Sequence, residues 1–298
     1  MRIRKIIFIC IVSCLAVTLV FAQGRFNRRS PITRGRGNVS PRGRGIYSPR
    51  GRGNYTLRSD FPTWEIDPEF ADDVFTFARI EYDSYGGMGW WDRWDNDYPD
   101  ADYNFSYRLQ QLTSLNVNPH PKLLRLTDPE LSDYPFIYFS GVQRMTLSRP
   151  EQIALRRYLL NGGFAMMSDF WNPQGWANML NQMRGVFPDR EPVELTLDEE
   201  IFHIVFDLKE LPQITDIQTW REGASFEYEH GYSSRGDEAP HFWSYYDDHG
   251  RMVALLCHNN DLGDGWEREG ENKQYFLECS EKHAYPMGIN VIVYALTH

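Results

Sequence analysis

Short β-rich runs alternate with helical runs along residues 74–183, and this order restricts the fold more than any other feature of the chain. The expected strands cover residues 74–82, 122–126, 135–139 and 164–167, and the expected helices cover residues 100–115, 148–161 and 173–183. The order β-α-β-β-α-β-α is typical of an open, mostly parallel sheet with helices on both faces. Ligands of such sheets bind beyond the carboxyl ends of the strands, so the loops that follow the strands are the places to look for a site.

Local signals support these assignments. Residues 135–139 form an unbroken apolar run, as strands in the interior of a parallel sheet do. The helix over residues 148–161 begins with Ser148 and has Glu151 three positions later, which is the pattern of a capping box. Further along the chain, two β-rich runs flank a turn at residues 247–250, which predicts a hairpin near the C-terminus. Residues 286–296 are expected to form a closing helix.

The charges are divided unevenly along the chain. Every acidic residue lies at or after Asp60, whereas residues 23–59 contain ten arginines and no acid. Of the 31 basic residues, three lie in the first 22 positions and ten in this tail, so 18 remain against 41 acidic residues, a balance of −23. The sequence therefore predicts a leader over residues 1–22, a basic tail over residues 23–59 and a single acidic α/β domain over residues 60–298.

The leader has the order of a signal peptide. Three basic residues precede an apolar run over residues 6–21, and the small residue Ala22 follows it. We expect cleavage there, export to the periplasm or the outside of a bacterial cell, and no transmembrane segment in the cleaved chain. An uncleaved anchor is the alternative, because a spanning helix needs about 17–25 apolar residues. A lipoprotein signal at Cys14 is disfavoured by the apolar residues that continue beyond it.

Two cysteines, Cys257 and Cys279, belong to the expected domain. Export permits a disulfide between them. Cys257 ends a β-rich run, however, where a buried free thiol is an equally ordinary outcome. Their separation gives no CxxC spacing, so we expect neither a zinc nor an iron-sulfur site.

The tail repeats an Arg-Gly-Arg-Gly octad at residues 34–41, 42–49 and 50–57. Each octad has too few apolar side chains to offset the entropy lost when the chain becomes ordered, so the tail is expected to be disordered. We interpret it as a flexible spacer with some affinity for an anionic surface polymer. An adhesive role, with Tyr47 and Tyr55 available for stacking, is the alternative. Export argues against a nucleic-acid partner.

The first candidate site is the loop over residues 90–102, which contains five aspartates and three tryptophans. Tryptophan faces and carboxylates together suit a sugar, while spaced carboxylates alone suit calcium. The structural alternative is that Asp97 or Asp100 caps the helix that follows and the tryptophans cover the edge of the core. The candidate ligand-binding residues of this loop are Trp90, Trp91, Trp94, Asp97, Asp100 and Asp102.

The second candidate follows the last strand of the predicted hairpin. His258 can act there as a general base or a ligand oriented by Asp261, and the carboxylates can bind calcium. The same residue types are also ordinary turn formers. The candidates for ligand binding are Asn259, Asp261 and Asp264, and those for a calcium ion are Asp261, Asp264 and Glu267.

The third candidate lies at the exit of the buried strand over residues 164–167. Asp169 would face the crevice there, with Trp171 beside it, and Asp169 is the strongest single candidate of the chain. Its structural alternative is the N-cap of the next helix. His203 is interpreted as a core histidine with its hydrogen bonds satisfied, on an amphipathic segment over residues 200–206.

Four segments taken together resemble the bacterial domain of unknown function 4159 family. They are residues 97–105 (DYPDADYNF), 126–131 (LTDPEL), 158–164 (YLLNGGF) and 260–267 (NDLGDGWE). The last residues of the chain also look like the ending of that family, so the resemblance covers most of residues 72–298. It implies a fold similar to class I glutamine amidotransferases, an open flavodoxin-like sheet, and brings no established activity. The position that holds a nucleophilic cysteine in amidotransferases is occupied by Ser168 without flanking glycines, so we do not expect glutaminase chemistry.

These features favour a non-catalytic extracytoplasmic binding or assembly module, with a glycan or protein partner at the crevice and no cofactor. The sequence has no G-x-S-x-G, P-loop or H-E-x-x-H motif that would indicate a nucleophile, a nucleotide or zinc. The alternative is a glycan-acting hydrolase or lyase, in which Asp169 or Asp100 is the acid/base and His258 assists.

Overall fold

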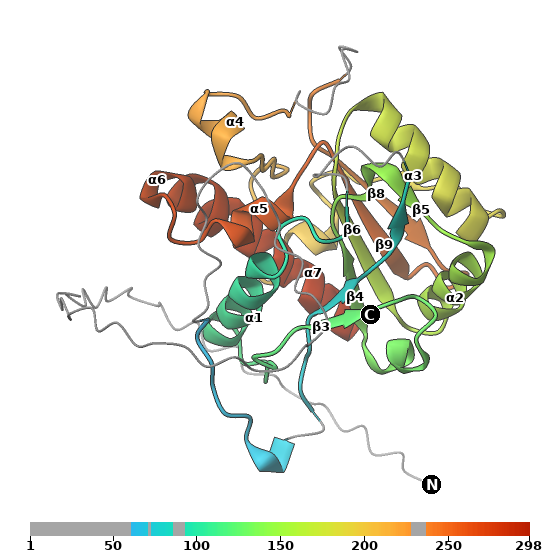
Figure 1. The fold of residues 1–298 in the computed structure, drawn as a ribbon, viewed down its shortest axis with the longest axis horizontal. Coiled ribbons are helices and arrows are strands. Elements are labelled where there is room, and N and C mark those ends of the chain that lie inside the picture. Colours follow the sequence, from blue (N-terminus) through green and yellow to red (C-terminus); the bar gives the residue numbers. More distant parts are fainter. Residues whose placement is uncertain (1–60, 71–72, 86–92, 228–236) are drawn as a thin grey trace, which may run out of the picture. The chain divides into compact units, whose positions relative to one another are not determined.

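A computed structural model describes residues 61–70, 73–85, 93–227 and 237–298 (Figure 1). The predicted leader and tail lie outside the described residues, and so do Trp90 and Trp91 of the first candidate loop. Within the described ranges, no helix combines the length and the apolar character needed to cross a membrane.

The chain has an α/β fold around an open seven-stranded sheet with the strand order β3-β1-β4-β6-β9-β8-β7. The five strands from β3 to β9 in this order are parallel, while β8 pairs antiparallel with both β9 and β7. The strands are β1 (Ala78–Ile80), β3 (Lys122–Leu124), β4 (Phe136–Phe139), β6 (Phe164–Phe170), β7 (Val193–Glu194), β8 (His241–Tyr246) and β9 (Met252–His258). A separate two-stranded ladder joins β2 (Asp83–Ser84) to β5 (Met145–Thr146).

Helices cover both faces of the sheet (Figure 1). The α-helices are α1 (Asp100–Leu112), α2 (Arg149–Leu160), α3 (Asn172–Val186), α4 (Ile217–Arg221), α5 (Leu262–Glu267), α6 (Lys273–Tyr275) and α7 (Tyr285–Thr297). Four 3-10 helices (Pro68–Phe70, Pro129–Asp133, Val142–Arg144 and Glu200–Phe202) and a π-helical segment (Phe276–Ala284) complete the described elements. One core contains buried residues of α1, α5 and α7, and the other contains those of α2 and α3.

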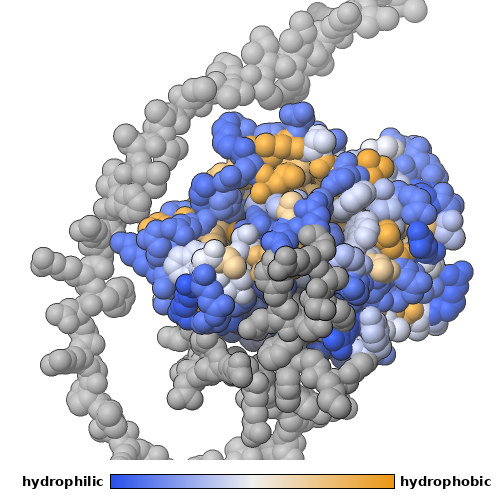
Figure 2. Space-filling model, turned by 90° about the horizontal axis from the view of Figure 1, so that it is seen from above, coloured by the Kyte–Doolittle hydropathy of each residue, from blue (hydrophilic) through white to orange (hydrophobic). Residues whose placement is uncertain are grey.

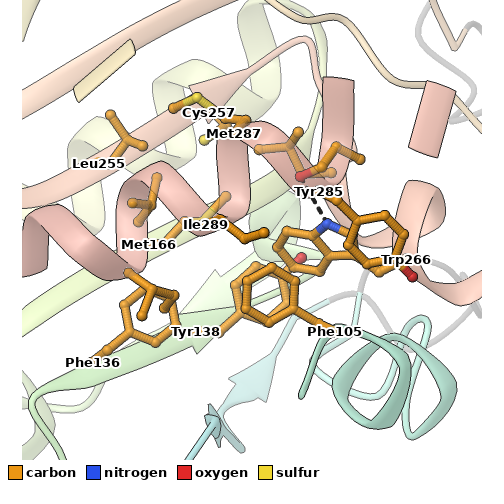
Figure 3. Packing of buried hydrophobic residues seen from close by; sticks show 14 of the residues in the cluster. Phe105, Phe136, Tyr138, Met166, Leu255, Cys257, Trp266, Tyr285, Met287 and Ile289 are labelled. Atoms are coloured by element: carbon orange, nitrogen blue, oxygen red, sulfur yellow. Dashed lines mark hydrogen bonds between the residues drawn. The ribbon is translucent and has the colours of Figure 1, made fainter. Parts of the chain in front are cut away.

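Alternation along the strands separates the two cores. In β4, Phe136 and Tyr138 enter the core beneath α1 and α7, whereas Ile137 and Phe139 enter the core beneath α2 and α3. The first core is rich in aromatic rings, and the rings of Phe105 and Trp266 stand 4.5 Å apart (Figure 3). The described surface seen in Figure 2 is mostly hydrophilic, with hydrophobic residues gathered in limited patches.

Most predicted elements are confirmed, with shifted boundaries. The capping box of α2 forms, since the Ser148 N–H donates to the Glu151 carboxylate over 2.8 Å. The hairpin of β8 and β9 and the closing helix α7 are also present. The first strand is shorter than residues 74–82, because only Ala78–Ile80 pair continuously with β3. Strand β6 is longer than residues 164–167 and includes Ser168 and Asp169, with a register shift before its last residue.

His203 corrects one interpretation. Residues 200–206 do not form an amphipathic element, because the 3-10 helix Glu200–Phe202 ends before His203. The His203 side chain is exposed instead of lying in the core, and its ring nitrogens bond to Asp207 and to the carbonyl oxygen of Leu197. The apolar residues around it, Ile201 and Phe202, are the ones that enter the core.

The strand order changes direction between β1 and β4. From β1 the chain passes through α1 to β3 on one side of β1, and then continues to β4 on the other side. Such a switch point leaves a crevice at the carboxyl ends of the two strands, which is where open α/β sheets bind ligands.

Candidate functional site

A buried ion pair lies near this switch point. Arg79, in the middle of β1, is fully buried, and its Nε atom donates to both carboxylate oxygens of Asp102 in α1 over 2.9 and 3.0 Å. Its Nη1 atom donates to the backbone oxygens of Trp94 and Asn96 over 2.9 and 2.7 Å. Burial alone would lower the pKa of Arg79. The charge of Asp102 and its hydrogen bond to Arg79 have the larger effect, and the pKa of Arg79 lies above its ordinary value. The pair therefore joins β1 to α1 and holds the segment that leads to Asp97.

Asp97 is buried and has left-handed backbone, with φ at 59°. Its Oδ2 atom accepts a hydrogen bond from the Ser140 hydroxyl, beyond the end of β4, over 3.3 Å. The N-cap of α1 is Pro99, and no side chain caps this helix, so the capping alternative for Asp97 and Asp100 is wrong. Burial, with the neighbouring charges of Glu267 and Asp169, raises the pKa of Asp97 well above its ordinary value.

Asp169 lies at the end of β6 and is also buried with left-handed backbone, φ 58°. Its Oδ2 atom accepts from the Asn96 amide over 2.5 Å, and its Oδ1 atom accepts from the Trp171 indole over 3.2 Å. The N-cap of α3 is Trp171, so Asp169 does not cap the helix. The carboxylate instead faces the same crevice as Asp97.

Positive φ angles concentrate at this edge of the sheet. Among the described residues, the non-glycine residues with positive φ are Asp97, Asp169, Asn172 and Asn259. Asp97 precedes α1, Asp169 lies near the end of β6, and Asn172 and Asn259 follow the carboxyl ends of β6 and β9. Asp and Asn tolerate this conformation better than other side chains do, but it still carries a cost that surrounding contacts must offset. Such clustering is a mark of functional edges in proteins.

Asp261 and Asp264 follow β9 and are nearly fully buried. Asp261 caps the short helix α5 by accepting from the Asp264 N–H over 3.2 Å. Burial raises the pKa of Asp261 well above its ordinary value, and the charges of Asp97 and Asp169 raise it further. Burial and Asp97 also raise the pKa of Asp264, although the nearby Arg268 opposes the shift.

These carboxylates converge into two sets of three. In each set, one oxygen from every residue lies within 4.8 Å of the others, and Asp264 is common to both. Calcium binds oxygen ligands at about 2.3–2.6 Å, so ligands on opposite sides of one ion are about 5 Å apart. The oxygens are therefore spaced as around a divalent cation. The two sets are Asp97, Asp264 and Glu267, and Glu227, Asp261 and Asp264.

Positive charge at the cluster comes from Arg268. Its Nε atom lies 2.7 Å from Glu267 Oε2 and 3.5 Å from Asp264 Oδ1. Tyr138 adds a fully buried hydroxyl, which lies beside Ser140 and close to the carboxylates of Asp97 and Asp261. Burial, with the charge of Asp261, raises the pKa of Tyr138 well above its ordinary value, so the phenol stays protonated.

Other predicted site residues have structural contacts. Ser168 donates to the backbone oxygen of Asn260 and accepts from the Leu262 N–H, each over 3.2 Å. Asn259 uses its side-chain oxygen to accept from the Asn172 N–H and its amide to donate to two backbone oxygens. Trp171 is fully buried, and its ring is nearly perpendicular to that of Phe226. These side chains hold the loops of the crevice together.

His258 lies apart from Asp261. Its Nε2 atom bonds to the backbone oxygen of Asn172 over 3.0 Å, and its ring stacks against those of Phe170 and Trp176. Burial, with a contribution from His241, lowers the pKa of His258 to about 4, so the imidazole is neutral at physiological pH. Trp94 is half-buried beside Tyr98, and Asp100 is half-buried at the first position of α1.

The structure thus brings five of the predicted residues to one crevice: Asp97, Asp169, Asp261, Asp264 and Glu267. They come from the segment before α1, the end of β6 and the N-cap and helix of α5. Sequence reasoning missed Arg79, Tyr138, Glu227 and Arg268. A signal existed for Arg79, because a charged residue in the middle of a β-rich run is exceptional in a buried strand. Cys257 and Cys279 are both buried free thiols.

Comparison with known proteins places the chain in a family without assigning an activity. No curated protein matches the chain. The model of one family, described as a domain of unknown function (DUF4159), matches residues 76–296, which is more than half of the sequence and includes every residue named in the acidic crevice. The chain therefore belongs to the DUF4159 family.

Proposed function

We propose that this protein is an exported binding module whose acidic crevice binds a divalent cation, with calcium as the best fit. The observation that carries the proposal is the convergence of carboxylate oxygens from Asp97, Asp261 and Asp264 in a buried place where their charges repel. Oxygen-only ligands suit calcium, magnesium and manganese, and the absence of histidine and thiolate from both sets disfavours zinc and copper.

A non-catalytic role agrees with the neighbouring residues. Both oxygens of Asp169 accept hydrogen bonds, and the neutral His258 faces Asn172, so neither is presented as a general base. Ser168, at the position of the amidotransferase nucleophile, is bound to backbone groups. The glycan-acting alternative thus has less geometric support. We retain the amidotransferase-like superfamily as part of the proposal, because the strand order and the switch point agree with it.

The remaining parts of the proposal come from the sequence. We propose that the leader directs export, that the tail is a spacer with affinity for an anionic surface polymer, and that a glycan or protein partner reaches the crevice. A secreted location suits a calcium site of low affinity, because extracellular modules bind calcium at about 10⁻⁴–10⁻³ M.

Thermal unfolding of the purified protein tests the cation site. We expect CaCl2 to raise Tm relative to EDTA, since a ligand that binds only the folded chain stabilises it by mass action. The Asp264→Asn variant should lose this shift, because Asp264 belongs to both sets of ligands. The Asp133→Asn variant makes the same chemical change at an exposed position and should keep it. Equal Tm values of the unmodified protein in EDTA and in millimolar CaCl2, MgCl2 and MnCl2 would overturn the proposal.

A further inference from the structure

We propose that the groove between α2 and the end of α3 is a docking site for an acidic peptide segment of a partner protein, which places an apolar side chain in the groove. This site is separate from the acidic crevice, because none of the residues that line the groove belongs to either set of carboxylates. The proposal therefore goes beyond the proposed function and does not depend on it.

The groove is a hollow of about 370 Å³ where α2 packs on the last turn of α3 (Figure 1). Its apolar lining comes from Ile153 of α2, Val186 of α3 and Pro188. Ile153 is 54% exposed, although Leu155 and Leu159 on the same helix are fully buried. The groove thus offers apolar surface, and room for an apolar side chain, at a place that the core leaves uncovered.

The two helices beside the groove are positively charged, unlike the rest of the domain. Residues 149–160 and 172–186 contain four arginines and one acidic residue, Glu151. Of the 18 basic and 41 acidic residues after residue 59, the other 14 and 40 lie elsewhere. Glu151 is buried and accepts hydrogen bonds from the Ser148 N–H and hydroxyl, so it offers little charge to a partner. Charge complementarity therefore favours an acidic partner at this surface.

The neighbours of Ile153 on the surface of α2 are arginines. Positions i−4, i+3 and i+4 are adjacent on a helix, and here they hold Arg149, Arg156 and Arg157. Arg156 pairs with Asp189 over 2.6 Å, whereas Arg149 and Arg157 form no ion pair within the described residues. Protein interfaces are enriched in arginine, so an exposed apolar side chain with arginines around it is typical of a surface that binds protein.

Hydrogen bonds hold two of these arginines at the border of the groove. Arg149 Nη1 donates to the backbone oxygen of Gly185, and Arg156 Nη1 donates to that of Val186, each over 3.1 Å. The bonds satisfy carbonyl groups at the end of α3 and leave Arg149 Nε and Nη2 without a hydrogen bond in the described parts of the chain. Because the guanidinium is held in place, it loses less conformational entropy when it binds a carboxylate.

The combination of apolar lining and guanidinium groups favours a peptide over an anionic polymer. A polymer of acidic sugars or of phosphates supplies the charge, but it has no apolar side chain to fill the groove. A peptide supplies both, with carboxylates for the arginines and an apolar side chain between them. Burial of that side chain adds to the affinity that the charges provide.

Titration with labelled peptides tests the site in the intact protein. The probes are acidic heptapeptides whose central residue is Leu, Ile, Phe or Ser, and fluorescence anisotropy gives the dissociation constants. We expect the apolar-centred peptides to bind about tenfold more tightly than the peptide with Ser, or better still, since only they bury an apolar side chain. No binding of any apolar-centred peptide, or equal binding of the peptide with Ser, would overturn the proposal.

Variants locate the binding on the chain. Arg149→Glu and Ile153→Asp, both at exposed positions, should each weaken binding of the Leu peptide by about tenfold or more, as the loss of a central interface residue does. Lys209→Glu is the matched control, because it makes the same change in charge magnitude and sign at an exposed residue that follows Leu208 of the other core. It should change the dissociation constant by less than about twofold, since remote charges are screened by salt.

Two further outcomes would contradict the proposal. An equal loss in Lys209→Glu would mean that net charge alone attracts the peptide. Binding of phosphatidylglycerol vesicles or soluble polyphosphate that Arg149→Glu weakens, together with no binding of the peptides, would assign the surface to a membrane or an anionic polymer instead.

Discussion

Two groups of buried charges lie at the same edge of the sheet, and they differ in how their charge is compensated. Arg79 and Asp102 are a matched pair, in which one guanidinium faces one carboxylate and also donates to two backbone oxygens. The carboxylates of Asp97, Asp261 and Asp264 face one another, and their pKa values are raised by burial and by mutual repulsion.

The difference separates a structural site from a ligand site. A buried ion pair neutralises its own charges and needs no ligand. Removing one partner leaves the other charge buried without a counter-charge, which is destabilising. A buried excess of one charge is stable only with bound protons or bound cations. The first group therefore stabilises the crevice, and the second provides the groups that bind a cation. Four predictions test this contrast.

The largest effect is expected from breaking the matched pair. The Arg79→Met variant should lose about 3–5 kcal/mol of unfolding free energy in urea, because Asp102 is left buried and unpaired. The exposed Arg157→Met variant makes the same change elsewhere and should differ from the unmodified protein by less than about 0.5 kcal/mol. Replacing both partners, as Arg79→Met with Asp102→Leu, should recover part of the loss. A small loss in Arg79→Met would mean that the pair is not what holds β1 to α1.

A smaller loss is expected at Gly263. In the Gly263→Ala variant the new Cβ would lie 2.4 Å from Asp97 Oδ2, so a ligand oxygen has to move. Overpacking of this kind costs about 1–3 kcal/mol, and the CaCl2-induced rise in Tm should disappear. In the control Gly185→Ala the new atom meets only the flexible end of Gln152, so the rise in Tm should remain. A full CaCl2 response in Gly263→Ala would place the cation elsewhere.

The third variant should have the opposite sign. Asp97→Asn removes a repelled charge while Asn retains the left-handed backbone, so the variant should be more stable than the unmodified protein in EDTA at pH 8. The gain should appear as a higher midpoint of urea unfolding, because the neutral amide avoids the cost that burial and the neighbouring carboxylates impose on the charged carboxyl. The response to CaCl2 should fall at the same time. Destabilisation in EDTA would show that Asp97 is not under repulsion.

The smallest effect is the pH dependence of that gain. A raised pKa means that the folded chain favours the protonated carboxyl, so the stabilising contribution of Asp97 is complete below about pH 3.9 and is lost as pH rises through its folded-state pKa. The advantage of Asp97→Asn should therefore grow from pH 5 to pH 8. His258 acts in the opposite direction. Because its pKa is lowered to about 4 in the folded chain, the folded chain loses stability as pH falls below about 6.5. His258 is present in both proteins, so its effect cancels in the difference. A gain that is independent of pH would contradict the assignment.

The order of strands and helices could be predicted because apolar periodicity is a local property of the chain. The loops that follow β6 and β9 could be singled out for the same reason, since parallel strands place their carboxyl ends together. The convergence of carboxylates from distant parts of the sequence could not be predicted. Glu227 is remote in sequence from Asp264, and nothing in the residues around Glu227 indicates that the two carboxylates meet.

Two further residues show the limits of pattern reasoning. Tyr138 lies within an unbroken apolar run, and its role follows only from where its hydroxyl points in the folded chain. The apolar residues around His203 predict a place in the core, but the short 3-10 helix turns those residues inward and leaves the histidine at the surface.

The most direct test of the account is the exchange of protons for cations in the crevice. Calorimetric titration of the metal-free protein with CaCl2, at pH 6 and in buffers of different ionisation enthalpy, measures both the binding and the protons released. The account predicts saturable binding with net proton release, because cations favour the ionised form of the carboxyls of Asp97, Asp261 and Asp264, whose pKa values are raised in the free crevice. No binding, or binding with no protons released, would contradict it.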